Sequence, residues 1–188
     1  MLPVVGIVGC AKPVDAPTTK PPSAVTASVA EPSPEPACVV ELGDAATLLG
    51  GTVSLRSIEG APLTSGPQTA QFTGPGPELC GATLDKVSLL RFPHDGSRTV
   101  EAVHAQFVEE LEGHGLQIGD AEERVADPDL RHVAYTDPAA TPPTLLYVAA
   151  TRLPEIDALF VVVYTASGAE LEPIKTAIQR SALTLSPS

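Results

Sequence analysis

The four histidines and their acidic neighbours are the side chains best able to hold a metal ion or transfer a proton. His104 follows Glu101 by three positions and His114 follows Glu110 by four, so on a helix each pair can share a face. Two ligands do not make a metal site, and no HExxH pattern or His–Cys cluster supplies the others. We therefore expect solvated helix residues here, with no metal site and no cofactor.

The other polar candidates favour structural roles. His94 and Asp95 lie in an expected turn in which Asp95 bonds to the backbone, and His132 is expected to face outward from a strand. No serine has the G-x-S-x-G pattern, and no Walker or dinucleotide fingerprint occurs. The acidic residues between 120 and 129 lack the glycine and final glutamate of an EF-hand, so we expect a solvated loop. No catalytic residue is predicted, and we expect that the protein is not an enzyme.

Cys10 carries a more specific signal. It ends an uncharged, mostly aliphatic stretch, and Ile7, Val8, Gly9 and Cys10 resemble the lipobox of a bacterial lipoprotein signal peptide. The resemblance implies that residues 1–9 are a signal-peptide remnant and that Cys10 is acylated after export. Because no Lys or Arg precedes the stretch, we expect the natural signal to begin upstream. The alternative is a frayed apolar tail with a stray cysteine.

The segment after Cys10 is rich in Pro, Ala, Ser and Thr and shows no helical or strand period up to Ala37. Such a composition cannot bury enough surface to fold, and it behaves as a semi-extended spacer. We therefore predict a lipidated tether over residues 10–37 and a single α+β domain over residues 38–188. No stretch reaches the ~20 apolar residues of a membrane-spanning helix, so the expected anchor is lipid.

The three cysteines form an odd set, which the lipoprotein resemblance explains. If Cys10 is acylated, Cys38 and Cys80 remain, and export permits them to join in a disulfide. The alternative is two buried free thiols, which pack as small apolar side chains. A zinc site is disfavoured because neither cysteine has a second ligand at finger-like spacing.

Charge limits the possible partners. The chain has 11 basic and 23 acidic residues and a formal net charge of −12. It therefore lacks the basic face that nucleic acids require, and anionic lipid headgroups would repel it. We predict no nucleic-acid partner, membrane contact through the acyl anchor, and an extracytoplasmic location with an envelope protein as partner. Ala11 points to the outer membrane if the cell has two membranes.

Hydrophobic periodicity predicts helices that flank one sheet. The residues expected on the core side of the first long helix are Val100, Val103, Phe107 and Leu111. Residues 158–165 are apolar on both faces and are expected to form a central strand. Helices are predicted at 39–49, 98–113 and 171–183, and strands at 52–58, 68–73, 86–92, 131–136, 145–151 and 158–165. The last three strands have short connections and must pair antiparallel, which gives an α+β fold with an antiparallel sheet flanked by helices.

This β-α-β-β-β-α order resembles the Mog1/PsbP-like superfamily, which includes small bacterial lipoproteins of the DcrB-like and LpqN-like groups. The strand end Leu90-Arg91-Phe92-Pro93 and the closing helix from Ile174 to Leu183 match the general layout of that superfamily. The resemblance covers about 100 residues and brings no catalytic residues. It implies a non-enzymatic binding or assembly module.

We therefore expect a tethered protein-interaction module that acts through a sheet face or through the loop at 60–81. The first alternative is a carrier of a small apolar ligand or lipid between sheet and helix, which would require an enclosed pocket of several hundred Å³. The second alternative is a hydrolytic enzyme, in which His94, Asp95 and His104 would have to meet beside a pocket.

Overall fold

The computed structural model describes residues 37–93, 96, 98–113, 121–127, 130–137 and 139–188, and it describes only the backbone at 111, 113 and 121–127. The chain divides into Met1–Pro36 and Ala37–Ser188, and all described residues belong to the second unit. None of the helices in that described part has the length and apolar character needed to cross a membrane.

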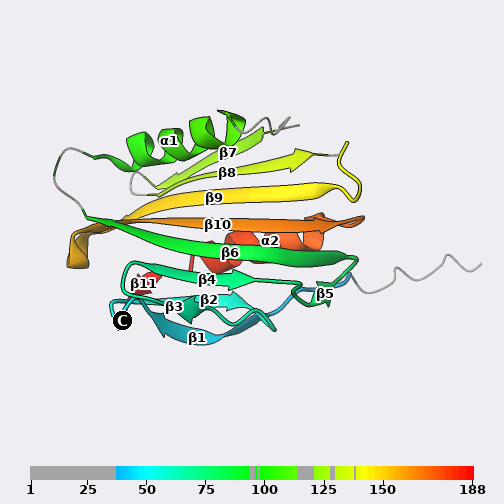
Figure 1. Cartoon of the computed structure of the whole chain (residues 1–188), viewed down its shortest axis with the longest axis horizontal. Coiled ribbons are helices and arrows are strands. Elements are labelled where there is room, and N and C mark those ends of the chain that lie inside the picture. Colours follow the sequence, from blue (N-terminus) through cyan, green and yellow to red (C-terminus); the bar gives the residue numbers. More distant parts are fainter. Residues whose placement is uncertain (1–36, 94–95, 97, 114–120, 128–129, 138) are drawn as a thin grey trace, which may run out of the picture. The chain divides into compact units, whose positions relative to one another are not determined.

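The centre of the domain is an antiparallel sheet with the strand order β3-β4-β6-β10-β9-β8-β7, in which β5 also pairs with β6 (Figure 1). Its strands are β3 Thr64–Ser65, β4 Thr69–Thr73, β5 Glu78–Leu79, β6 Ala82–Pro93, β7 Ala121–Asp127, β8 Leu130–Asp137, β9 Thr144–Leu153 and β10 Ala158–Gly168. A smaller antiparallel sheet has the order β1-β2-β11, with β1 Leu42–Leu48, β2 Val53–Ile58 and β11 Ser186–Pro187. The helices are α1 Val100–Gly113, α2 Glu172–Ala182 and the short 3-10 helix η1 Pro154–Ile156.

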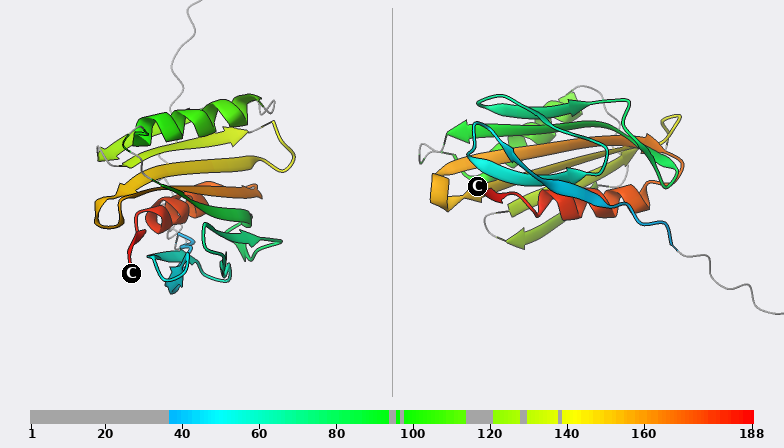
Figure 2. Two further views of the ribbon diagram at one scale, coloured as in Figure 1. Left: turned by 60° about the vertical axis from the view of Figure 1, so that its left-hand side comes forward. Right: turned by 90° about the horizontal axis from the view of Figure 1, so that it is seen from below.

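The two helices lie on opposite faces of the large sheet. Helix α1 contacts β8 and β9, whereas α2 packs between the other face and strand β2 of the small sheet (Figure 2). Side chains of β10 alternate between the two cores, with Phe160 and Tyr164 on the α2 side and Leu159 and Val161 on the α1 side, all of them buried. The predicted α+β class, antiparallel sheet and central strand are thus confirmed.

The predicted helix at 39–49 is wrong, because residues 42–48 form strand β1, which pairs with β2 in a hairpin. The turn between them uses Leu49, Gly50 and Gly51, all with positive φ. Positive φ at consecutive residues is the requirement of tight hairpin turns, and glycine meets it without steric cost. The Gly-Gly pair therefore reverses the chain between two strands instead of ending a helix.

The expected solvated loop between 120 and 129 is also wrong over residues 121–127, which form strand β7 and pair with β8. Strand β8 would otherwise expose its outer backbone groups, and β7 supplies their partners. The closing helix, predicted over 171–183, spans Glu172–Ala182 and has Pro173 in its first turn, where proline is tolerated.

Candidate functional site

Helix α1 covers only part of its face of the sheet. Most of its contacts are with β8 and β9, and in Figure 1 it lies beside the β7–β9 half of the sheet, although the core on its side also includes Leu90 and Phe92 of β6. The cover ends within β10: on the α1 side of this strand Val161 is fully buried, whereas Val163 is only half-buried. This face is therefore open where Val163 on β10, Ser88 on β6 and Gln71 on β4 lie side by side in the sheet.

A groove of about 390 Å³ lies where this open face meets the flank of α1. It is open to solvent and not enclosed. Its apolar lining comes from Leu90 on β6, Val163 on β10 and Phe107 on α1. Its polar lining comes from Gln71 on β4, from Lys86 and Ser88 on β6, and from Glu110 on α1.

The alternation of strand β6 explains this mixture. Val87 and Leu89 point into the core on the α2 side and are fully buried. The residues between and around them, Lys86, Ser88 and Leu90, point to the opposite face, where they line the groove. Strand β6 thus has one face of buried apolar residues and one accessible face that lines the groove.

The groove carries one cation and one anion on different walls. Lys86 belongs to β6 and Glu110 to α1, and both side chains are exposed. Among the described residues, neither of them forms an ion pair or a hydrogen bond. Both charges are therefore available to a bound molecule.

The aromatic side chain that lines the groove, Phe107, is held in place by a residue of the sheet. Phe107 meets Phe92 of β6 edge to face, with ring centroids 5.9 Å apart. Such edge contacts are favourable for aromatic pairs beyond the area that they bury. The position of Phe107 is therefore set by the sheet and does not depend on a partner.

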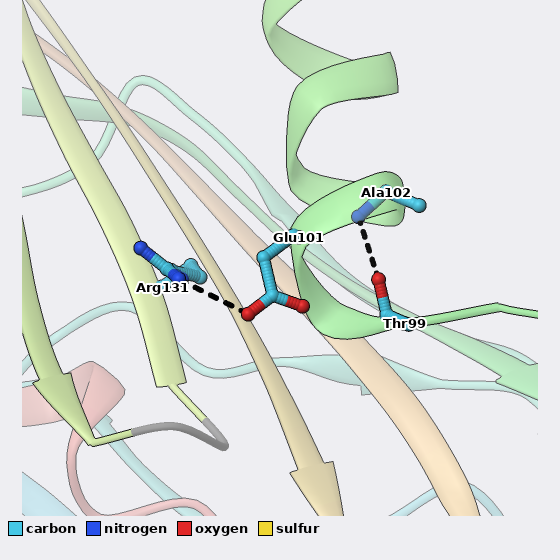
Figure 3. Close-up of polar contacts among 4 residues, drawn as sticks. All are labelled: Thr99, Glu101, Ala102 and Arg131. Atoms are coloured by element: carbon cyan, nitrogen blue, oxygen red, sulfur yellow. Dashed lines mark hydrogen bonds and ion pairs between the residues drawn. The ribbon is translucent and has the colours of Figure 1, made fainter.

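The first turn of α1 is fixed by polar contacts with β8 (Figure 3). The Thr99 hydroxyl accepts a hydrogen bond of 3.2 Å from the amide of Ala102 and so caps the start of the helix. The Glu101 carboxylate accepts a bond of 3.0 Å from the Arg131 guanidinium. A bond to the backbone amide, and then bonds to Arg131 and Thr99, hold the pKa of Glu101 below its usual value. These contacts fix the orientation of the helix that forms one wall of the groove.

Two histidine predictions are wrong. His104 was expected to be solvated, but only 7% of it is exposed, because it lies on the buried side of α1 beside Val103. His132 was expected to face outward, but it is 8% exposed and its ring centroid lies 5.7 Å from that of Tyr147. The local pattern of the chain reveals the burial of neither histidine.

Most of the other residues singled out in the sequence fall outside the part of the chain that the structure describes. His94, Asp95, His114, Asp120 and Asp129 lie outside the described residues, as does Cys10. Among the described residues, no three of His, Cys, Asp and Glu come close enough together to hold a metal ion. His104 does not line the groove.

Cys38 and Cys80 form a disulfide with Cα atoms 5.7 Å apart. This bond fastens the beginning of the described domain to the turn before β6, the strand that lines the groove. The backbone carbonyl of Gly81, the residue after Cys80, accepts a hydrogen bond of 3.1 Å from the amide of Ala169, just after β10. The bond therefore ties the chain entering the domain to the two central strands.

A second open hollow, of about 480 Å³, lies at the C-terminal end of β9, beside η1 and the last residues of the chain. Leu183, which is 63% exposed, lies on its rim. The cation of this hollow, Arg152, already pairs with Asp157 at 3.3 Å, unlike Lys86 in the groove beside α1. We therefore take the groove as the candidate site.

No protein-family model matches the sequence, and neither does any curated protein. Solved structures that are similar in fold include two of Mog1 proteins. One is the Saccharomyces cerevisiae Ran-binding protein Mog1p, with a TM-score of 0.51 and 11% identity over 78% of this chain and 95% of that one. The other is a Mog1 mutant with a glutamate replaced by alanine, with a TM-score of 0.53 and 11% identity over 77% of this chain and 95% of that one. The described domain has a Mog1-like fold.

This likeness confirms the expected fold, and at 11% identity it shows the fold alone. Sequence reasoning had named a sheet face as one possible binding surface without identifying Lys86, Ser88, Phe107 or Glu110 as its residues. One signal was present, because a lysine interrupts the apolar alternation of strand 82–93. Only the position of α1 shows that this lysine borders a groove.

Proposed function

We propose that this chain is a lipid-anchored, extracytoplasmic protein-interaction module that binds a protein of the bacterial envelope in the groove beside α1. The observation that carries the proposal is an open groove with an apolar floor and two charges that no described residue neutralises. Protein interfaces combine these features, with an apolar centre and a polar rim. An open groove also suits a partner surface better than a small lipid, which would need an enclosed cavity.

Two further observations support the proposal. Mog1p, which has a similar fold, is a Ran-binding protein, so the fold is compatible with protein recognition. The lipobox-like residues before Cys10 and the Pro-rich segment after it fit a tether that ends at the disulfide. From Cys80 to Lys86 the extended chain spans roughly 20 Å, so a partner in the groove would be held near the tethered end of the domain.

Photo-crosslinking in intact cells tests the interaction. A photoreactive amino acid at Ser88 is expected to give a discrete protein adduct, whereas the same amino acid at Arg180 on α2 gives none. An adduct that forms equally at both positions, or at neither, would contradict the proposed surface.

The anchor has its own test. Intact mass of the membrane fraction is expected to show a mature chain that begins at an acylated Cys10, and a Cys10→Ala variant is expected to leave that fraction. Recovery of the native chain in the cytosol with all three thiols free would contradict the location that we propose.

A further inference from the structure

We infer that the groove receives an amphipathic α-helix from the partner, lying beside α1 on the open face of the sheet. This inference rests on the proposed function, because it specifies the partner of the same groove. Its first basis is width. From β10 to β4 there are two strand spacings, roughly 10 Å, and packed helices lie about 8–10 Å apart. The uncovered strip therefore has room for one helix next to α1.

The floor of the strip has the chemistry of a helix-binding surface. Leu90 and Val163 are half-buried on the sheet, and Phe107 rises from α1 beside them. A helix with an apolar stripe would complete their burial and extend the core that α1 already forms over β8 and β9. Each aliphatic side chain removed from water in this way stabilises the complex in proportion to its area.

The charges define the flanks of the bound helix. Lys86 lies on the sheet side of the groove and Glu110 on the α1 side, and no described residue pairs with either. A helix seated between them presents one flank to each wall, as flanking positions do beside the apolar seam of a coiled coil. The partner helix is therefore expected to carry an acidic residue toward Lys86 and a basic residue toward Glu110.

The test uses two synthetic peptides of about 18 residues, long enough for five helical turns. Both have the same leucine stripe, and one has glutamate on both flanks while the other has lysine on both, so the result does not depend on the direction in which the helix lies. Binding to the full chain, with Cys38 and Cys80 oxidised, is measured by fluorescence anisotropy. The wild-type chain has a net charge of −12 and should bind the basic peptide more tightly than the acidic one, so each substitution is compared with the wild type for the same peptide.

Charge reversal in the groove should separate the peptides. Glu110→Lys is expected to bind the acidic peptide about threefold to tenfold more tightly and the basic peptide more weakly, and Lys86→Glu is expected to do the opposite. The matched controls are Glu109→Lys on the exposed part of α1 and Arg180→Glu on α2, neither of which lines the groove. Both controls should change the affinities by less than about twofold, the size of a long-range charge effect at physiological salt.

A third peptide, with two prolines in the middle of the stripe, should lose binding because proline breaks a helix. Equal effects of the groove and control substitutions, binding of the proline peptide, or no binding of any peptide would each overturn the helix inference. Crosslinks at Ser88 that persist in the last two cases would leave the proposed interaction standing with a partner of another shape. Loss of those crosslinks would count against the interaction itself.

Discussion

The hydroxyl of Ser181 connects three elements through one buried chain of hydrogen bonds. Tyr164 of β10 lies fully buried and shares a bond of 2.7 Å with the Ser181 hydroxyl on α2. Ser181 in turn donates a short hydrogen bond to the backbone carbonyl of Arg56 on β2. Because Ser181 donates to Arg56, the Tyr164 hydroxyl must donate to Ser181. Burial raises the pKa of Tyr164, so its hydroxyl keeps its proton over the physiological range.

This arrangement predicts an unusual ranking of two substitutions. Tyr164→Phe removes the outer donor and leaves the bond from Ser181 to Arg56 intact, so it should cost about 1 kcal/mol of unfolding free energy. Ser181→Ala removes both hydrogen bonds and leaves a buried donor on Tyr164 and a carbonyl on Arg56 without their partner. Each such group costs about 1–3 kcal/mol, so the total should reach about 2–6 kcal/mol.

The double variant completes a cycle, because Phe at position 164 removes the donor that Ser181→Ala strands. We expect its cost to be at least about 1 kcal/mol smaller than the sum of the single costs. Urea unfolding at neutral pH, followed by circular dichroism, measures all four free energies. The reasoning is refuted if Ser181→Ala costs no more than Tyr164→Phe, or if the two costs add.

Three further predictions concern other parts of the fold. The disulfide closes a loop of 42 residues, which corresponds to about 4 kcal/mol, so Cys38→Ser/Cys80→Ser should lower the melting temperature by roughly 8–16 °C and abolish any effect of dithiothreitol on unfolding. The pKa of Glu101 is lowered in the folded state, so the stability that its carboxylate contributes is present above its usual pKa of 4.5 and is lost as the pH falls through the lower, folded value. Glu101→Gln should therefore lower the melting temperature at pH 7, and its melting curve should converge with that of the wild type in acid. A methyl group at Gly76 would overlap a backbone carbonyl of β6, whereas one at Gly66 has ordinary room, so Gly76→Ala should lower the melting temperature by several degrees more than Gly66→Ala.

The sequence predicted the elements whose residues bury an apolar face. Strands 86–92, 131–136, 145–151 and 158–165 and the helices beginning near residues 98 and 171 were all expected, and each has a period of two or 3.6 residues that survives in the structure. The central position of β10 followed from its apolar character on both faces, because only a strand covered on both sides buries both. Local periodicity was therefore enough to predict these elements.

Predictions from local patterns were wrong where pairing with another strand determines the structure. Residues 42–48 have a composition that suits a helix, but their partner β2 and the Leu49-Gly50-Gly51 turn make them a strand. Residues 121–127 are too polar to signal a strand, yet the open edge of β8 pairs with them. His104 and His132 are buried because other elements lie over them, and no local signal shows this.

By itself the sequence determined which cysteines could pair and that an antiparallel sheet flanked by helices forms, because composition and periodicity reflect which side of each segment is buried. Only the tertiary structure decided that α1 covers half of its sheet face and that Lys86 and Glu110 border the remaining groove. Packing of α1 against the sheet brings these two residues close together, and such packing depends on the shapes of many side chains at once. A surface built from distant segments therefore leaves little trace in any one of them.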